Sequence, residues 1–295
     1  MNLNEFIQRH QLPDAYAESA QQIFLPFAEW LERCVAENGD KTYVLGLNGA
    51  QGTGKTTVAE LIGEHLQSTY GRRVVVVSID DIYLTRDQRA QLGERVHPML
   101  KTRGVPGTHD VALGLSVIEQ LQSLQQGETF DVPRFDKSRD DRYPQSEWTA
   151  VSGPVDLVIF EGWCVASRPQ TDAALRDPVD ALEASADSDG RWRRYVNDKL
   201  RTDYAALFSR LDGLLFLRAP GFDAVQRWRL EQEHKLRQSA AGDADAVMSD
   251  AQVTEFIQYY ERITRNNIKE LPSVADAVIE LGDDHRAVSL GFRKP

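Results

Sequence analysis

The stretch GLNGAQGTGKTT, residues 46–57, decides the fold of this chain. It contains Gly-x-x-x-x-Gly-Lys-Thr, the pattern of a phosphate-binding loop, in which glycines let backbone N–H groups approach a phosphate. The apolar run 42–49 before it predicts a strand, and the helical spacing of apolar residues in 58–66 predicts a helix after it. The helix N-terminus would then face the bound anion, a context that disfavours a chance glycine-rich turn. We predict that a nucleoside triphosphate is bound by Gly49, Gly52, Thr53, Gly54, Lys55, Thr56 and Thr57.

Within this loop the pattern assigns separate tasks to neighbouring residues. Lys55 is expected to reach the β- and γ-phosphates, and the Thr56 hydroxyl is expected to bind Mg²⁺. For Thr57, a helix-capping or packing role is the preferred interpretation. The loop alone does not distinguish a motor, a switch, a kinase or a regulator.

Composition narrows the class of protein. The chain has 295 residues, a formal net charge of −11 and an ordinary globular share of hydrophobic residues, 41%. The acidic balance argues against sequence-independent nucleic-acid binding, which draws its affinity from a basic face. Two cysteines favour a reducing, cytoplasmic setting over a disulfide framework, and no apolar stretch has the length of a signal peptide core or a membrane span. We expect a cytoplasmic protein without membrane or nucleic-acid partners.

Strands and helices alternate along the chain, which predicts an α/β fold with a mostly parallel sheet and helices on both faces. Apolar runs predict buried strands at 42–49, 72–81, 155–162, 211–220 and 277–282. Helical spacing predicts helices at 110–126, 191–210, 223–239 and 250–271. Residues 1–40 read as a helical extension with a kink or boundary at Pro26, and 41–295 as one domain. The acidic, small and polar segment 170–190 is expected to be mostly an exposed insertion.

Carboxylates follow two of the predicted strands. Asp80 and Asp81 end the second strand, and Glu161 ends the third. Ligands of parallel sheets gather at the carboxyl ends of the strands, so these acids should lie beside the glycine loop. Phosphoryl transfer to an alcohol needs a base near the hydroxyl and oxygen ligands for Mg²⁺, and these residues can supply both. The alternative is that these carboxylates are only solvated or cap the next helix, and this alternative is strongest for Asp81.

An arginine-rich segment follows the fourth strand. Arg229, Glu233 and Arg237 fall on one helix face, with Arg227 nearby. These arginines can close over a triphosphate and stabilise the charge of the transferring group. A surface helix with internal salt bridges is an equal alternative, because acidic residues alternate with the arginines.

Several motifs together resemble a known family. The order GxxxxGKT, SIDDIYLT, RGVPGTHD, VPRFDKS, VIFEGW, QRWRLEQEHKLR and MSDAQVTEFIQYYER is similar to the P-loop D-glycerate 3-kinases of plants and their bacterial and fungal relatives, which are related to pantothenate, uridine and phosphoribulose kinases. The resemblance covers about residues 40–290. It implies a three-layer P-loop kinase fold with a helical lid at 221–240.

The resemblance also implies roles for individual residues. Asp80 matches the acid that accepts the proton of the substrate hydroxyl, and Glu161 matches the carboxylate of the metal shell. Lys55, Arg227 and Arg229 are the other expected catalytic residues, and Arg237 is expected on the nucleotide. The expected acceptor-binding residues are Asp81, Tyr83, Arg103, His109, Asp110, Arg134 and Lys137.

One segment departs from the family pattern. The family motif RGNAGSHD reads RGVPGTHD here, at 103–110, and the polar asparagine is lost, so the acceptor is the least defined part of the prediction. His109 is either an acceptor ligand or a hydrogen-bonded core histidine. The other histidines show no metal-ligand spacing. Cys164 is expected to be a small buried residue rather than a nucleophile.

The leading hypothesis is an ATP- and Mg²⁺-dependent kinase, a monomer or homodimer, that phosphorylates a small hydroxy acid, with D-glycerate first. The same chemistry on pantothenate, a nucleoside or another small molecule is the alternative among enzymes. A regulatory nucleotide-binding protein is the alternative of another class, although no glutamine is indicated that would position water for hydrolysis.

Overall fold

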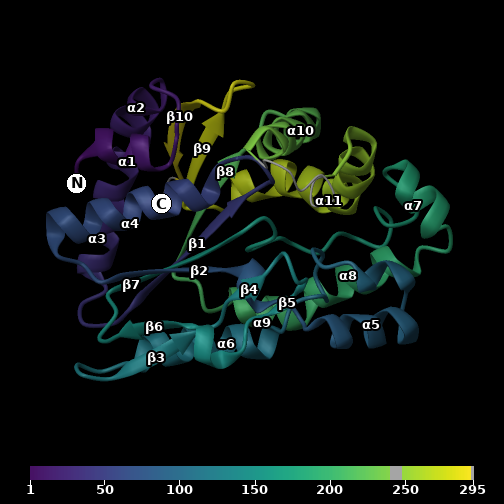
Figure 1. Cartoon of the computed structure of the whole chain (residues 1–295), viewed down its shortest axis with the longest axis horizontal. Helices are drawn as coiled ribbons and strands as arrows, with labels where there is room; N and C mark the ends of the chain where they lie inside the picture. The colour runs from purple at the N-terminus through teal and green to yellow at the C-terminus, as the bar shows by residue number, and fades with distance from the viewer. Residues whose placement is uncertain (240–247, 294–295) are drawn as a thin grey trace.

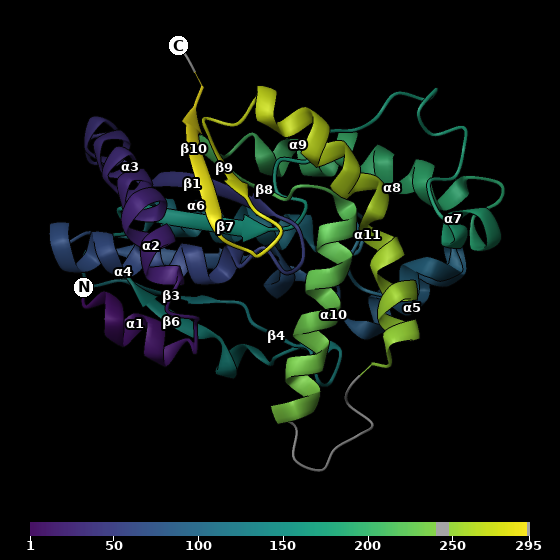
Figure 2. The same cartoon turned by 90° about the horizontal axis from the view of Figure 1, so that it is seen from above.

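The computed structural model describes residues 1–239 and 248–293 and is shown in Figures 1 and 2. The N-terminal segment is helical, as predicted, with α1 (Leu3–Arg9), α2 (Tyr16–Ser19), a π-helical turn (Ala20–Phe24) and α3 (Leu25–Glu37). Pro26 is the second residue of α3, directly after the π-helical turn, and the chain is helical without a break from Tyr16 to Glu37. The irregularity expected at Pro26 is therefore the π-helical turn before it, and no helix boundary lies there.

A six-stranded sheet forms the centre of the molecule. Its strands are β1 (Tyr43–Gly49), β2 (Val74–Ser78), β7 (Leu157–Gly162), β8 (Gly213–Arg218), β9 (Ala277–Leu281) and β10 (Ala287–Phe292). They are ordered β10-β9-β8-β1-β7-β2, and all adjacent pairs are parallel except β10 with β9. Because β1 lies between β7 and β8, the glycine loop that follows it has neighbours on both sides.

The predicted strands are all present, with one difference in burial. β2 is the edge strand of the sheet, and most of its residues are only partly buried, whereas the sequence indicated a strand buried on both faces. The strand also ends at Ser78, and a 3-10 turn (Ile79–Ile82) carries Asp80 and Asp81 away from the sheet. The run of four valines does not reveal whether a strand has a second neighbour.

Helices cover both faces of the sheet (Figure 1). On one face α4 (Lys55–Tyr70) packs against β1, β2 and β7, and α3 packs on α4. On the other lie α6 (Val111–Ser123), α8 (Arg191–Arg201) and α9 (Asp203–Phe208), with α5 (Arg86–Arg95) beyond them. The helix expected over 191–210 is interrupted at Thr202, whose backbone is not helical.

The region predicted as a lid forms a long helix, which packs against a second long helix. α10 (Phe222–Ser239) and α11 (Asp250–Glu270) lie side by side, as Figure 2 shows from above. The predicted lid ends at residue 240, which lies outside the described residues. Two small antiparallel sheets were not predicted: β3 (Thr129–Val132) pairs with β6 (Thr149–Ser152), and between them in the chain β4 (Phe135–Asp136) pairs with β5 (Asp141–Arg142).

The segment 170–190 is mostly exposed, as expected, but it is anchored at several points. It includes the short helix α7 (Ala181–Ala186), and Leu175 is buried. Glu183 and Asp187 are also buried, each in an ion pair with an arginine of a longer helix. The acidic composition therefore marks internal ion pairs as well as a solvated surface. Among the described residues, no helix is long and apolar enough to cross a membrane.

Candidate active site

The phosphate-binding loop connects the end of β1 to the start of α4. Gly52 and Gly54 have φ values of +80° and +76°, in the left-handed region where a side chain is strained. The Thr53 hydroxyl donates to the Ala50 carbonyl at 2.8 Å and closes the turn. The backbone thus takes the compact path that brings the N-terminus of α4 toward an anion, and Lys55 is the first residue of that helix.

Thr56 and Glu161 meet beside this loop. The Thr56 hydroxyl donates to Oε1 of Glu161 at 3.1 Å. Glu161 is 2% exposed, and its Oε2 has no hydrogen-bond partner within the described part of the chain. Burial raises the pKa of this carboxyl, although Lys55 opposes the shift. A hydroxyl beside a buried, unpartnered carboxylate oxygen is a donor set that suits a hard divalent cation such as Mg²⁺.

Asp80 lies on the neighbouring 3-10 turn with both carboxylate oxygens engaged. Oδ2 accepts from Nζ of Lys137 at 2.7 Å, and Oδ1 accepts from the Tyr83 hydroxyl at 2.9 Å. Burial alone would raise the pKa of Asp80, but the nearby charges of Lys137 and Lys55 outweigh it and lower the pKa to about 2. Asp80 is therefore an ionised, oriented carboxylate close to the phosphate loop.

The cationic residues expected around the acceptor are each paired with a carboxylate. Arg134 donates to Asp81 at 2.7 Å, and Arg103 forms an ion pair with Asp140. Lys137, which holds Asp80, is the third. Burial raises the pKa of Asp81, against the effect of Arg134. An anionic ligand binding here would compete with carboxylates for these three cations.

His109 is packed within the site. Its ring stacks on Tyr83 at a centroid distance of 4.4 Å, and Nδ1 lies 2.5 Å from the Tyr204 hydroxyl. Burial lowers the pKa of His109 to about 3, so the ring is neutral at physiological pH. Nε2 has no partner among the residues described. His109 therefore combines a core environment with one nitrogen that a ligand can still use.

Asp110 has a clear structural role. Its Oδ1 caps α6 by accepting the Leu113 N–H at 3.0 Å, and its Oδ2 pairs with Arg142 at 3.2 Å. Both oxygens are thus in use, which favours helix capping over acceptor binding.

The arginines of α10 point in different directions. Arg229 pairs with Glu233 at 2.6 Å, and both side chains are largely buried. Arg227 pairs with Asp283 in the loop between β9 and β10, and Arg237 donates to the Met248 carbonyl at 2.7 Å, at the start of α11. In this conformation the three arginines are occupied by partners, as the salt-bridge interpretation of the sequence anticipated.

Two tyrosines near the site were not selected from the sequence. Tyr260 of α11 packs edge-on against Trp163 at 4.7 Å. Burial raises the pKa of its hydroxyl, and among the charged groups close enough to act on it are Asp80, Arg103 and Arg229. Tyr204 of α9 orients His109. Both belong to segments remote in sequence from Asp80, and a tyrosine within a helix gives no local signal of such a position.

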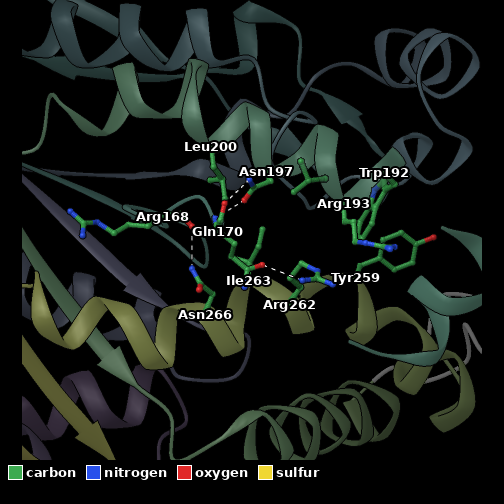
Figure 3. A pocket seen from close by; sticks show the side chains of 11 residues that line it. Arg168, Gln170, Trp192, Arg193, Asn197, Leu200, Tyr259, Arg262, Ile263 and Asn266 are labelled. Atoms are coloured by element: carbon green, nitrogen blue, oxygen red, sulfur yellow. Dashed lines mark hydrogen bonds between the residues drawn. The ribbon is translucent and has the colours of Figure 1, made fainter. Parts of the chain in front are cut away.

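A small pocket between α8 and α11 is a weak candidate for a second site (Figure 3). Its polar groups bind one another: the Gln170 N–H donates to Asn197 at 2.7 Å, and Asn266 donates to the Arg168 carbonyl at 3.1 Å. The free space is about 10 Å³, too small for a substrate.

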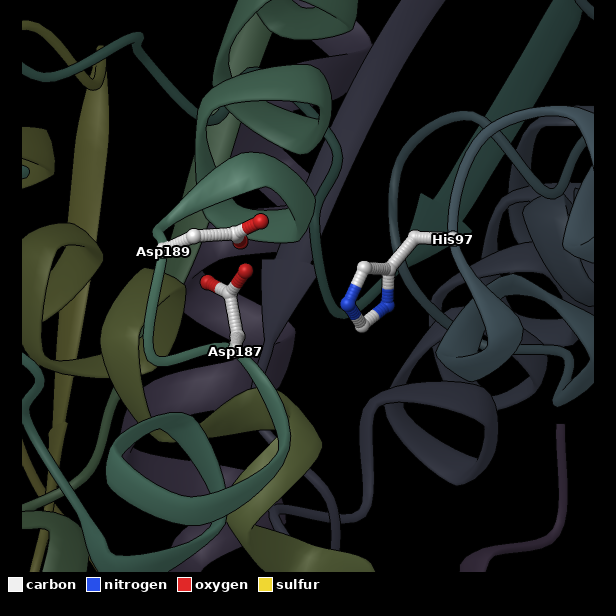
Figure 4. Close-up of side chains that lie close together, drawn as sticks. All are labelled: His97, Asp187 and Asp189. Carbon is white, nitrogen blue, oxygen red and sulfur yellow. The ribbon is translucent and has the colours of Figure 1, made fainter.

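His97 faces Asp187 and Asp189 at the start of α8, with ligand atoms within 4.8 Å of one another (Figure 4). The Asp187 carboxylate already accepts from the Arg193 guanidinium at 2.9 Å. Nδ1 of His97 accepts the Met99 N–H at 3.4 Å, which leaves the proton of a neutral ring on Nε2. Metal-bound histidines instead donate from their second nitrogen. This cluster fits a helix cap better than a metal centre.

Comparisons with known proteins identify the family of this chain. The model of the phosphoribulokinase / uridine kinase family matches residues 44–180. The chain is 31% identical to the chloroplastic D-glycerate 3-kinase of Arabidopsis thaliana over 252 residues, which are 80% of this chain and 52% of the plant enzyme. It thus spans about half the length of that relative. It is 34% identical to the uncharacterized kinase mug58 of Schizosaccharomyces pombe over 233 residues, 75% of this chain and 79% of the yeast protein.

A solved structure supports the fold. The D-glycerate 3-kinase from Cryptococcus neoformans matches with a TM-score of 0.77 at 24% identity, over 92% of this chain and 99% of that chain. The three-layer P-loop kinase fold expected from the sequence is therefore confirmed.

Proposed function

Because the chain belongs to the phosphoribulokinase / uridine kinase family, we propose that it is an ATP-dependent kinase that transfers the γ-phosphoryl group to a hydroxyl of a small hydroxy acid, D-glycerate first. The observation that carries the proposal is Asp80, an ionised carboxylate fixed between Lys137 and Tyr83. A switch that hydrolyses its nucleotide has no need of a carboxylate placed to receive an alcohol.

The donor half of the site is the glycine loop with its neighbours. Lys55 and the N-terminus of α4 would bind the phosphates, and Thr56 and Glu161 would hold Mg²⁺. When bound, the metal neutralises charge on the β- and γ-phosphates. Arg229 is the lid arginine best placed to act on the transferring group, since it lies close to Tyr260 and is shielded from solvent.

The acceptor half is formed by the residues around Asp80. Asp80 accepts the proton of the attacking hydroxyl and orients the oxygen toward the γ-phosphorus. Arg134 and Arg103, with Lys137 on Asp80, form a cationic rim that suits a carboxylate on the acceptor, because the two arginines can exchange their present carboxylate partners for the ligand. A plant relative of this chain is named as a D-glycerate 3-kinase, and glycerate carries both a hydroxyl and a carboxylate.

An acceptor screen tests the proposal. Purified protein is incubated with ATP and Mg²⁺ and with D-glycerate, L-glycerate, pantothenate, uridine or a sugar phosphate, and ADP release and phosphorylated product are both measured. We expect product with D-glycerate and little ATP turnover without an acceptor. Product with only another compound would reassign the acceptor. Fast ATP hydrolysis that no acceptor changes would reject the kinase proposal in favour of a regulatory protein.

A further inference from the structure

A small, partly enclosed cavity lies beside the phosphate-binding loop. It separates the carboxyl end of β1 from α11, has a free space of about 10 Å³, and is bounded by Ala50 of the loop on one side. Most of the other lining side chains are apolar, and the exceptions are Asn48, Thr264 and Asn267.

Those polar side chains are buried and incompletely hydrogen-bonded. Asn48, Thr264 and Asn267 are 0%, 2% and 3% exposed. Oδ1 of Asn48, Oγ1 of Thr264 and Oδ1 of Asn267 have no hydrogen-bond partner in residues 1–239 and 248–293. Leaving a buried polar atom unpaired costs about 1–3 kcal/mol, so three around one cavity require an explanation.

The orientation of the two amides is fixed by their other ends. Nδ2 of Asn48 donates to the Val165 carbonyl at 2.6 Å, and Nδ2 of Asn267 donates to the Trp163 carbonyl at 3.2 Å. Neither side chain can be turned over without placing an oxygen against a carbonyl oxygen. The unpaired atoms of both residues are therefore acceptors, while the Thr264 hydroxyl can donate.

We propose that the cavity binds one ordered water molecule that joins β1 to α11. The water donates its two protons to Oδ1 of Asn48 and Oδ1 of Asn267 and accepts the proton of the Thr264 hydroxyl. This arrangement satisfies all three atoms, and the free space matches the 10–15 Å³ that one water needs. A monovalent cation fits less well, because the three oxygens give it too few ligands and the hydroxyl proton would still lack an acceptor.

The position of this water links the lid side of the molecule to the phosphate site. Asn48 immediately precedes Gly49, the first glycine of the loop, and α11 is the helix that packs on the lid helix α10. The bridge thus ties the last residues of β1 to α11 at a point where the structure assigns them no direct hydrogen bond among the described residues.

Diffraction from crystals of the full chain provides the direct test. We expect one peak of density in the cavity, within about 2.7–3.2 Å of all three oxygen atoms. A cavity without density would overturn the proposal. A peak that gives an anomalous signal after a rubidium soak would also overturn it, because the ligand would then be a cation.

The substitution Thr264→Val gives a second test, which depends on the sign of a stability change. If the water is present, valine removes one of its three partners, and the midpoint of urea unfolding falls. If the cavity is dry, valine removes an unsatisfied buried hydroxyl, and the midpoint rises or stays the same. Thr254→Val, on the same helix, is the matched control, because the Thr254 hydroxyl donates within the helix to the Asp250 carbonyl at 2.8 Å.

Discussion

Asp80 shows how one carboxylate acquires its chemistry from its neighbours. Its burial alone would favour the neutral acid, yet Lys137 and Lys55 keep it ionised and lower its pKa to about 2. A carboxylate with so low a pKa is a weak base in the free enzyme. We therefore propose that Asp80 acts by orienting the hydroxyl and by receiving the proton as the oxygen attacks phosphorus.

The substitution Asp80→Asn tests this role. The amide keeps the shape of the side chain but cannot take a proton, so we expect ATP binding to be nearly intact and turnover to fall about 10²–10⁴-fold. Steady-state kinetics and calorimetric titration with ATP separate the two effects. Asp131→Asn, on the exposed strand β3, is the matched control. Unchanged turnover in Asp80→Asn would remove Asp80 from the mechanism.

The lowered pKa of His109 predicts how the stability of the fold depends on pH. Burial lowers its pKa from 6.5 to about 3, so the unfolded chain binds a proton between these values that the folded chain does not. His109 therefore has no effect on the pH dependence of the free energy of unfolding above pH 6.5. Below pH 6.5 it lowers that free energy by about 1.4 kcal/mol per pH unit. Protonation of Asp80 lowers the free energy of unfolding further, but only below about pH 4.

We therefore expect His109→Gln, which cannot titrate, to lose less stability than the wild type between pH 6.5 and pH 4. Urea unfolding at several pH values measures the difference. Parallel curves for the two proteins would show that the ring is not buried as a neutral group.

At the scale of elements, the phosphate loop and α10 are in direct contact. A Cβ atom on Gly52 would lie 2.7 Å from Cβ of Trp228 in α10, and the φ of Gly52 is +80°. The Trp228 indole also donates to the Asp283 carbonyl at 2.9 Å, which fixes the helix against the loop after β9. The glycine is thus required by both conformation and packing.

The substitution Gly52→Ala is expected to lower stability by at least about 1 kcal/mol and to weaken ATP binding, because the loop or α10 must move. Gly71→Ala is the control: Gly71 has φ of +69° at the end of α4 but no atom within 4 Å of the added Cβ. The control should lose stability and keep its affinity for ATP. Equal ATP affinity in both variants would show that contact with Trp228 does not shape the loop.

The elements that the sequence predicted are those with strong local patterns. The five parallel strands are apolar runs, and α4 has both a helical period and a glycine end at Gly71. The sequence did not predict the strands β3 to β6 or β10, because short, half-exposed strands carry little hydrophobic periodicity. The break at Thr202 depends on how α8 and α9 pack, which a continuous helical pattern does not record.

The candidate site also has parts that the sequence predicted and parts that it did not. Asp80 and Glu161 could be located from sequence because a parallel sheet gathers its strand ends at one edge. The Lys137–Asp80 pair and the Tyr204 hydroxyl against His109 join segments 57 and 95 residues apart. Contacts of this kind arise only when the chain folds, so spacing in the sequence could not identify them.

At the scale of the whole molecule, the segment 170–190 is held in place by ion pairs. Glu183, 1% exposed at its side chain, pairs with Arg262 of α11 at 2.6 Å. Arg262 also donates to the carbonyls of Ala174 and Asp177, at 2.9 Å and 2.8 Å. With a further hydrogen bond to the Gln170 side chain at 3.3 Å, one buried arginine connects the segment 170–190 at four residues to α11, the helix that packs beside α10.

Removing the carboxylate should leave that arginine buried without a counter-charge. We expect Glu183→Ala to lower the free energy of unfolding by about 3–5 kcal/mol, since breaking a buried pair exposes the full desolvation cost of its partner. Glu183→Gln, which keeps a hydrogen-bond acceptor, should lose less. Glu255→Ala, at an exposed position of α11, should change stability by no more than about 0.5 kcal/mol. Chemical unfolding measures all three, and limited proteolysis reports whether the segment 170–190 detaches first. A loss in Glu183→Ala no larger than that of Glu255→Ala would mean that water already solvates the pair and that the insertion is held by its apolar contacts, such as Leu175, instead.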